Sequence, residues 1–280
     1  MKILIFGSNG QVGVALSDLF FKENLILPTR EDINLFKYRL LDSYIKKINP
    51  DLIINAAAYT NVDLAESERE LAFILNRDVP KKIAIISKEL NIPFIHFPTD
   101  YVFDGKKDIA YTELDKENPL SVYGISKFEG DQEIQLIGGN FFIFRISWVY
   151  SNVRKNFYLT IINMYKKNKK LKVINDQFGV PTSNYFIAEN IHKIIPLLSK
   201  SKPGVYNLVP DGYCSWFDFA YEIIKKKYNS SNISAISSKD YQFSAPRPAN
   251  SILDNSKFKK TFMLEFNEWK FELDKIINES

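Results

Sequence analysis

The chain has 280 residues, 45% of them hydrophobic, and a formal net charge of +4 from 37 Lys and Arg against 33 Asp and Glu. These values suit a globular protein with a full core, and the charge excess is too small to indicate a nucleic-acid-binding surface. The single cysteine, Cys214, excludes an internal disulfide and fits a reducing cytosol. No apolar run reaches the roughly 18 residues of a membrane span, and the run at residues 2–6 is too short for a signal peptide. We therefore expect a cytoplasmic protein with no nucleic-acid or membrane partner.

Short apolar runs alternate with helical patterns through the first half of the chain. The runs that predict buried parallel strands are 2–6, 25–27, 52–55, 94–97 and 141–147. Helical patterns lie between them, near 11–22, 66–90 and 121–137. This alternation predicts an α/β fold, a Rossmann-type doubly wound parallel sheet. Right-handed crossovers would bring the carboxyl ends of the strands to one edge, where ligands bind.

The pattern changes after residue 148. Helices are predicted near 156–168, near 184–199 and from Trp216, and "PGVYNLV" predicts one more buried strand. We expect a smaller α/β substrate-binding lobe that covers the strand edge, with the chain returning once to the main sheet. The predicted cofactor-binding domain comprises 1–148 plus about 179–208, and the predicted lobe comprises about 149–178 and 209–280.

The first strand runs directly into "GSNGQVG", with Gly7, Gly10 and Gly13. Glycines here permit a tight turn and let the backbone approach a pyrophosphate, which the following helix N-terminus would bind. The spacing differs from the G-x-G-x-x-G fingerprint, and a mere tight turn is the alternative. The position after a clean strand favours cofactor binding.

The second strand ends in "LPTRED", which bears on the choice of cofactor. Sites for NAD usually place an acid here, whereas an arginine accommodates the 2′-phosphate of NADP. The residue just past the strand is Arg30, and Glu31 and Asp32 come after it. This order favours NADPH, with a surface arginine as the alternative and NADH kept as a second acceptable cofactor.

The third and fourth strands end in segments that suit a ligand. "NAAAYT" at 55–60 has small side chains that let a cofactor lie close, although close packing of strand and helix would favour alanine as well. "PTDYVFDG" at 98–105 places Thr99 and Asp100 at the same edge. Thr99 as a helix cap or turn residue is the alternative there.

Three Tyr–Lys pairs share the spacing of a catalytic Y-x-x-x-K: Tyr123 with Lys127, and two pairs that begin at Tyr165 (with Lys169) and Tyr221 (with Lys225). Tyr123 is the candidate that shares an edge with the glycine loop and a strand-end threonine. A nearby ammonium and the nicotinamide charge would lower the pKa of a tyrosine from about 10 and help it to donate a proton beside a hydride donor.

The motifs, in their order, resemble the dTDP-4-dehydrorhamnose reductases, which belong to the extended short-chain dehydrogenase/reductases. The resemblance covers nearly the whole chain and rests on "GSNGQVG", "INAAAYTNVDLAE", "PTDYVFDG", "NPLSVYGISK", "RISWVY", "INDQFGVPTSN" and "APRPANSILDNSKF". It implies NADPH-dependent reduction of the C4 keto group of dTDP-4-dehydro-L-rhamnose to dTDP-L-rhamnose. It also implies a dTDP-sugar as the partner molecule, and we expect a monomer or weak homodimer.

The resemblance also assigns roles to residues. The catalytic triad would be Thr99, Tyr123 and Lys127. The cofactor would be held by Tyr123, Lys127, Gly7, Asn9, Gly10, Gln11, Val12, Arg30, Ala56, Ala57, Ala58 and Tyr59. The sugar nucleotide would be bound by Thr99, Asp100, Tyr101, Trp148 and Arg247, whose charge would suit a diphosphate.

Two positions depart from the family pattern. Pro98 replaces the serine that usually precedes the catalytic threonine, which leaves the triad intact. Ala15 occupies the position at which some members carry a glutamate that ligates Mg²⁺ at a dimer interface, so we predict no metal site.

Two other functions are kept as alternatives. One is a related nucleotide-sugar 4-ketoreductase that makes another 6-deoxysugar, since few residues form the sugar pocket. The other is a non-catalytic regulatory subunit of the methionine adenosyltransferase β type, against which the intact Thr99–Tyr123–Lys127 set argues.

Overall fold

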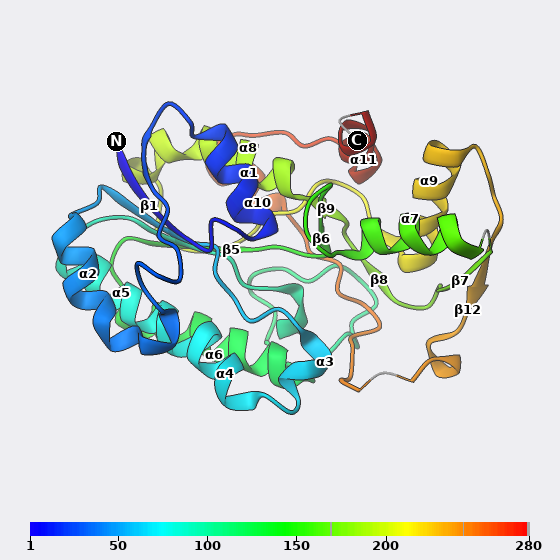
Figure 1. Cartoon of the computed structure of the whole chain (residues 1–280), viewed down its shortest axis with the longest axis horizontal. Coiled ribbons are helices and arrows are strands. Elements are labelled where there is room, and N and C mark those ends of the chain that lie inside the picture. Colours follow the sequence, from blue (N-terminus) through cyan, green and yellow to red (C-terminus); the bar gives the residue numbers. More distant parts are fainter. Residues whose placement is uncertain (169, 243, 279–280) are drawn as a thin grey trace.

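The computed structural model describes residues 1–168, 170–242 and 244–278, and within them six parallel strands form the central sheet in the order β10-β5-β4-β3-β1-β2 (Figure 1). The strands are β1 (Lys2–Phe6), β2 (Asn24–Ile26), β3 (Leu52–Asn55), β4 (Phe94–His96), β5 (Phe141–Arg145) and β10 (Gly204–Asn207). The strand order reverses at β1, because β2 lies on one side of it and β3 on the other. The predicted doubly wound α/β fold is confirmed, and the reversal places a ligand crevice beyond the ends of β1 and β3.

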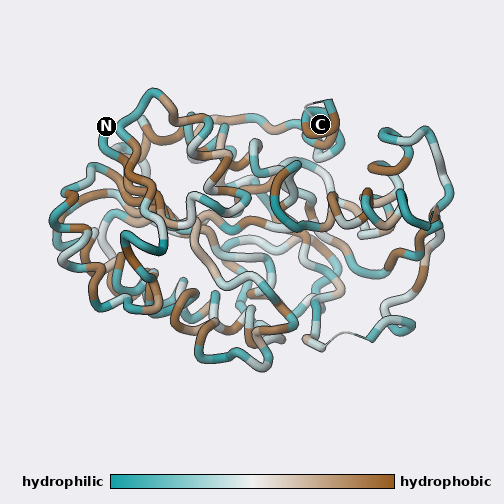
Figure 2. Tube along the Cα trace, viewed as in Figure 1, coloured by the Kyte–Doolittle hydropathy of each residue, from teal (hydrophilic) through white to brown (hydrophobic). Residues whose placement is uncertain are grey.

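Helices cover both faces of this sheet (Figure 1). One face is covered by α1 (Gln11–Leu19), α8 (Asn184–Ile194) and α10 (Ser256–Phe262). The other is covered by α2 (Leu41–Ile48), α5 (Val79–Glu89) and α6 (Val122–Ile137). The strands are apolar on both sides, as the brown core of Figure 2 shows, because neither face meets water.

The helix expected over 66–90 is interrupted in the structure. The segment consists of α3 (Val62–Ala65), α4 (Arg69–Phe73), a π-helical turn (Ile74–Asp78) and α5. The π turn adds a wide backbone loop that faces α6, a feature that hydrophobic periodicity does not reveal. The sequence analysis also missed α2 and the 3₁₀ turn Leu35–Leu40 that precedes it, because α2 buries only two side chains, Leu41 and Ile45.

The lobe has a core of its own, separate from the two faces of the sheet. It is built from α7 (Phe157–Asn168), α9 (Trp216–Tyr228), α11 (Trp269–Asn278) and the parallel pair β7 (Leu171–Ile174) and β12 (Ile233–Ile236). A capping box of Ser215 and Asp218 fixes the start of α9. Two short pairs join this lobe to the sheet domain: β6 (Val149–Tyr150) with β9 (Thr182–Ser183), and β8 (Phe178–Gly179) with β11 (Cys214–Ser215).

Helix α10 lies within the range predicted for the lobe, yet its buried Phe258 and Phe262 pack against Phe144 of the sheet. The chain therefore returns to the sheet twice, once through α8 and β10 and once through α10. The rest of the predicted division into domains stays a prediction. Further short 3₁₀ turns are Asp100–Val102, Ile195–Lys200 and Ser238–Asp240.

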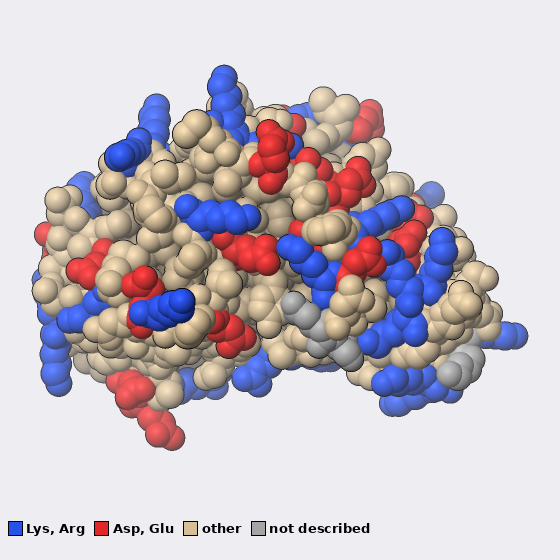
Figure 3. Space-filling view, turned by 90° about the horizontal axis from the view of Figure 1, so that it is seen from above, with Lys and Arg blue, Asp and Glu red and all other residues tan. Residues whose placement is uncertain are grey.

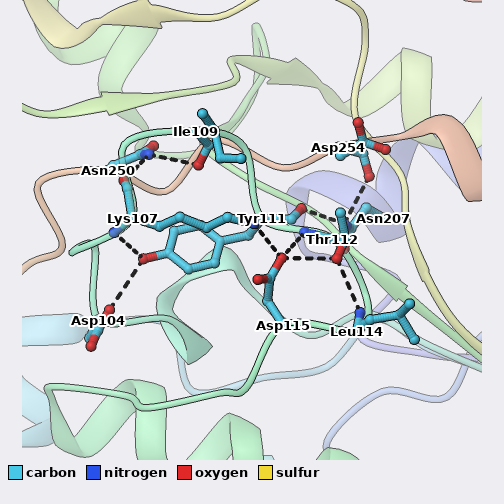
Figure 4. A network of polar contacts seen from close by, with 10 residues as sticks. All are labelled: Asp104, Lys107, Ile109, Tyr111, Thr112, Leu114, Asp115, Asn207, Asn250 and Asp254. Atoms are coloured by element: carbon cyan, nitrogen blue, oxygen red, sulfur yellow. Dashed lines mark hydrogen bonds and ion pairs between the residues drawn. The ribbon is translucent and has the colours of Figure 1, made fainter.

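A polar network fastens the segment after β4 to the last third of the chain (Figure 4). The Nδ2 atom of Asn207 donates to the carbonyls of Tyr111 (3.1 Å) and Asp254 (2.9 Å). Asn250 donates to the carbonyls of Lys107 (2.6 Å) and Ile109 (3.1 Å). Because Asn207 belongs to the sheet and Asn250 to the C-terminal segment, the network joins the segment after β4 to both.

The surface carries both signs of charge. On the face seen in Figure 3 acidic and basic side chains are interspersed over most of the surface. The lysine run at the end of α9 is partly paired, since Lys226 contacts Asp274 at 2.5 Å. In the described residues, no helix combines the length and apolar character that crossing a bilayer requires.

Candidate active site

A cleft of about 1070 Å³ lies at the carboxyl edge of the sheet, between the sheet domain and the lobe. It brings together most of the residues that the sequence predicted as a site. The predicted residues that line it are Gly7, Asn9, Gly10, Gln11, Val12, Arg30, Ala56, Ala57, Ala58, Thr99, Asp100, Tyr101, Tyr123, Lys127 and Trp148.

The glycine loop forms one end of this cleft. Gly7 has φ of 78°, and a Cβ there would lie 2.4 Å from the Ala57 nitrogen, so only glycine fits between β1 and β3. The Gly10 N–H donates to the Gly7 carbonyl at 2.9 Å, and α1 begins one residue later. Among the described residues no side chain caps the start of α1, and its first turn holds no acid. Its amide groups therefore suit a pyrophosphate.

The loop after β2 places the positively charged Arg30 at the cleft. Pro28, Thr29 and Arg30 line it. The Asp32 carboxylate instead accepts hydrogen bonds from the Thr29 backbone N–H and hydroxyl, each at 2.8 Å. The Asp32 carboxylate is thus used to stabilise the turn, whereas the charged side chain of Arg30 lines the cleft where an adenosine ribose would lie. This agrees with the preference for NADPH that the sequence predicted.

Thr99 follows β4 and acts both as a cap and as a cleft residue. Its hydroxyl accepts from the Tyr101 N–H (3.2 Å) and donates to the Asp100 carboxylate (3.1 Å). Burial raises the pKa of Asp100 to about 6, so this carboxylate is ionised at neutral pH but not far below it. Thr99 is therefore both a turn residue and a residue that lines the cleft.

Helix α6 carries Tyr123 in its first turn, and two side chains fix that turn. Ser121 accepts a hydrogen bond from the Gly124 N–H at 3.2 Å, and Glu66 accepts one from the Val122 N–H at 2.9 Å. A Cβ at Gly124 would lie 2.4 Å from the Tyr101 carbonyl, so the glycine of "YGISK" lets α6 approach the strand-end loop. The phenol ring of Tyr123 consequently stands edge-on to the ring of Tyr101, with centroids 5.8 Å apart.

Lys127 lies one turn further along α6 and is almost fully buried, with 1% of its surface exposed. Its Nζ donates to the Phe97 carbonyl at 2.7 Å, two residues before Thr99. Burial lowers the pKa of Lys127, and the negative charge of Asp131 acts against this change.

Burial also raises the pKa of Tyr123 to about 12, with the Thr99 hydroxyl acting in the opposite direction. This is opposite to the lowered pKa that the sequence analysis expected. The reason is that desolvation of the phenolate outweighs the hydrogen bond, and the Lys127 hydrogen bond is directed to a backbone carbonyl. In this structure Tyr123 is a protonated donor across the neutral pH range.

The lobe contributes an aromatic wall. Trp148 has φ of 44°, and its ring stacks on that of Trp216, with centroids 3.4 Å apart and planes at 6°. Gly179 lies behind the ring of Trp148, and a Cβ there would be 2.4 Å from the indole. The sequence analysis missed Trp216; a large aromatic directly after a cap serine, where a helix begins, was the available signal.

The lobe also reaches over the glycine loop. Nε of Arg154 donates to the Asn9 carbonyl at 2.8 Å, and Ser151 donates to Oε1 of Gln11 at 2.7 Å. Arg154 lines the cleft beside the expected pyrophosphate position and was missed, because no local motif marks it. The side chain of Gln11 contacts Val149 and Ser151 of the lobe, and its predicted contact with a cofactor stays a prediction.

Two predicted residues do not line the cleft. The phenol of Tyr59 donates to Glu68 at 2.7 Å, and its backbone is held by buried Asn76 from the π turn. Arg247 pairs with Asp63 through Nη2 at 2.7 Å and also interacts with Tyr101, which lines the cleft.

The alternative Tyr–Lys pairs lie elsewhere. The Tyr165 hydroxyl donates to Ser230 at 2.6 Å within the lobe core, and its partner Lys169 lies outside the described residues. On α9 the Lys225 ammonium lies over the ring of Tyr221, 5.9 Å from its centroid. Neither tyrosine is part of the cleft lining, so location separates Tyr123 from them.

Comparison with known proteins agrees with this geometry. Residues 1–280 match the family model described as the RmlD substrate binding domain. The dTDP-4-dehydrorhamnose reductase of Salmonella typhimurium is 36% identical over 292 residues, covering 100% of this chain and 98% of that protein. The chain belongs to the dTDP-4-dehydrorhamnose reductase family. The resemblance inferred from the order of motifs is thereby confirmed.

Other members of the dTDP-4-dehydrorhamnose reductase family agree. The enzyme of Sinorhizobium fredii is 37% identical over 282 residues, covering 96% of this chain and 94% of that protein. The crystal structure of the Bacillus anthracis enzyme in complex with NADP matches with a TM-score of 0.94 at 30% identity, covering 100% of this chain and 99% of that one. The protein is therefore an oxidoreductase of this family.

Proposed function

We propose that the protein reduces the C4 keto group of dTDP-4-dehydro-L-rhamnose with NADPH, with Tyr123 as the proton donor. The observation that carries this proposal is the meeting of Thr99, Tyr123 and Lys127 in one cleft with the glycine loop. The residues present fit the cofactor, because Gly7 leaves room beside Ala57 and α1 presents uncapped amides. The NADP complex of the Bacillus anthracis relative supports the same choice.

NADPH supplies the hydride that reaches the carbonyl carbon. Tyr123 donates its proton to the carbonyl oxygen, so that the ketone becomes a secondary alcohol and the phenol becomes a phenolate. Thr99 would donate a hydrogen bond to the same oxygen once its hydroxyl turns from the Asp100 carboxylate to the substrate, and so hold that oxygen near Tyr123. The Lys127 ammonium lies on the same face of α6 and stabilises the phenolate that forms, which solvent then reprotonates.

The sugar nucleotide would lie against the lobe wall. The stacked indoles of Trp148 and Trp216 offer a flat apolar surface at the cleft, and Asp100 offers a carboxylate acceptor for a sugar hydroxyl. Arg247 is paired with Asp63 through Nη2, and its charge also acts on Tyr101 of the cleft. We therefore keep Arg247 as the proposed ligand of the diphosphate, held in position by Asp63.

The test is to incubate the protein with NADPH and dTDP-4-dehydro-L-rhamnose, follow the absorbance of the reduced nicotinamide, and identify the product sugar by NMR. We expect NADPH oxidation and dTDP-L-rhamnose. Formation of the C4 epimer, or turnover only with another keto-sugar, would favour the related 4-ketoreductase. Tight NADPH binding without turnover of any keto-sugar would favour a regulatory subunit.

A further inference from the structure

Helix α6 carries three functional groups on one face at four-residue intervals: Tyr123, Lys127 and, one turn further, Asp131. Asp131 has 1% of its surface exposed, the same as Lys127. Neither carboxylate oxygen of Asp131 has a hydrogen-bond partner within the described part of the chain. A buried carboxylate without a hydrogen bond is costly, and its position behind the lysine gives it a role.

Arg145, at the end of β5, is the cation of the sheet whose charge acts on Asp131. It is fully buried, and its Nη2 donates to Glu117. The other two guanidinium nitrogens have no hydrogen-bond partner among the described residues, and the group lies 5.3 Å from the ring centre of Phe103. Burial raises the pKa of Asp131 to about 7, the positive charges of Arg145 and Lys127 act against this rise, and Glu117 adds to it. Arg145 therefore favours the ionised carboxylate.

The other groups around Lys127 supply no negative charge. His96, from β4, is buried, and burial lowers its pKa well below the ordinary value, so the ring is neutral. Tyr123 is protonated, as described above. In the described residues, Asp131 is the anion whose charge raises the pKa of Lys127, and the same charge also raises the pKa of Tyr123, so its benefit to the phenolate comes through Lys127 alone.

A buried lysine with a single carbonyl acceptor tends to lose its proton, and a neutral amine cannot stabilise a phenolate. We propose that Asp131 is a positioning residue for the reduction: its buried carboxylate is the counter-ion that keeps the Lys127 ammonium charged beneath Tyr123. The proposal rests on the function proposed above for Tyr123 and Lys127. A chain of alternating charges, Glu117–Arg145–Asp131–Lys127, then runs from the surface to the catalytic phenol.

A purely structural role for Asp131 predicts something different. If Asp131 served only to balance Arg145, its loss would lower stability but leave the titration of Lys127 unchanged. Glu117 already pairs with Arg145, so the charge of Asp131 is not required for that purpose alone.

The first test is kinetic and uses Asp131→Asn, which keeps the shape of the side chain. We expect kcat at neutral pH to fall about tenfold, and the alkaline limb of the kcat profile to move down by about one pH unit. KM and the Kd for NADPH should stay within about threefold. Asp131→Glu, which keeps the charge, should recover part of kcat. The matched control is Glu133→Gln on the same helix, whose carboxylate faces Lys81 at 2.9 Å; its profile should not move.

The second test needs no sugar substrate, so it separates this proposal from the proposed function. The lysine ammonium signals of ¹⁵N-labelled protein are followed against pH, and that of Lys127 is assigned by its loss in Lys127→Met. In Asp131→Asn the Lys127 signal should disappear at lower pH than in the wild type. A folded Asp131→Asn protein with an unchanged Lys127 titration would overturn the proposal, whether or not the enzyme reduces this sugar.

Glu117→Gln gives a test of opposite sign and covers the case in which Asp131→Asn does not fold. The Glu117 side chain is 23% exposed, but it is the hydrogen-bond partner of buried Arg145, so the melting temperature of this variant is measured alongside to confirm that it folds. Removing its charge lowers the pKa of Asp131, which strengthens the counter-ion, and the Lys127 titration should move to higher pH by about half a pH unit. An unchanged titration in this variant would also overturn the proposal.

Discussion

The two walls of the cleft are built in different ways. The sheet wall carries Thr99 just after β4 and Tyr123 and Lys127 on α6, where capping side chains and buried backbone contacts hold them. The lobe wall carries the partly exposed Trp148 and Trp216 and the exposed Arg154. The difference indicates that the reacting groups sit on a rigid scaffold, while recognition is left to a wall that can adjust. Replacements on the sheet wall should lower kcat, and replacements on the lobe wall should raise KM.

The largest effect is expected on the sheet wall. Tyr123→Phe removes the proton donor, and kcat should fall by about 10²- to 10⁴-fold, while the Kd for NADPH changes less than about threefold. Stopped-flow turnover and NADPH titration measure the two quantities. Tyr221→Phe is the matched control on α9 and should behave as the wild type. Near-normal turnover by Tyr123→Phe would place the chemistry elsewhere.

On the lobe wall, Trp216→Ala removes one member of the indole stack. Because the stacked surface is lost in ground state and transition state alike, KM for the sugar nucleotide should rise about tenfold with kcat within about threefold. Steady-state kinetics at saturating NADPH check this. Tyr213→Ala, at an exposed position outside the cleft lining, serves as control. A fall in kcat with unchanged KM would contradict the contrast between the walls.

Arg30 lies at the cofactor end, on an exposed loop, and its effect should be smaller. Arg30→Ala should weaken NADPH binding about three- to tenfold and leave NADH binding nearly unchanged, because only NADPH has a 2′-phosphate. Fluorescence titration with both cofactors measures the ratio. Arg39→Ala, outside the cleft lining, is the control. An equal loss for both cofactors would show that Arg30 does not select between them.

Asp100 gives the smallest effect, on stability. Burial raises its pKa to about 6 from 3.8 in the unfolded chain, so the folded state binds the proton more tightly. This group's contribution to stability is therefore full at low pH and is lost as pH rises toward 6. Asp100→Asn should unfold about 2–3 °C above the wild type at pH 7 and close to it at pH 4. Equal melting temperatures at pH 7 would mean that the carboxylate is compensated.

Sequence patterns located the sheet wall because its residues directly follow strands. Thr99 follows β4 and the glycine loop follows β1, and the ends of parallel strands share an edge. Trp216 and Arg154 were missed because the lobe brings them to the cleft through tertiary packing, which leaves no local period or motif. The ion pair of Arg247 with Asp63 could not be predicted for a related reason: the two residues are 184 positions apart in the sequence. The sequence analysis did not predict the π turn at Ile74–Asp78, because its apolar pattern is the same as that of the helices on either side.

The stacked indoles give the protein a built-in optical reporter. The sequence has three tryptophans, and Trp148 and Trp216 lie parallel at 3.4 Å in the cleft, whereas Trp269 is buried in the lobe core. Two chromophores at this separation couple their excited states, so the pair should contribute an exciton band to the near-ultraviolet circular dichroism. A ligand that parts or tilts the rings would change that band without any label. Binding to the lobe wall could then be followed separately from events at Tyr123.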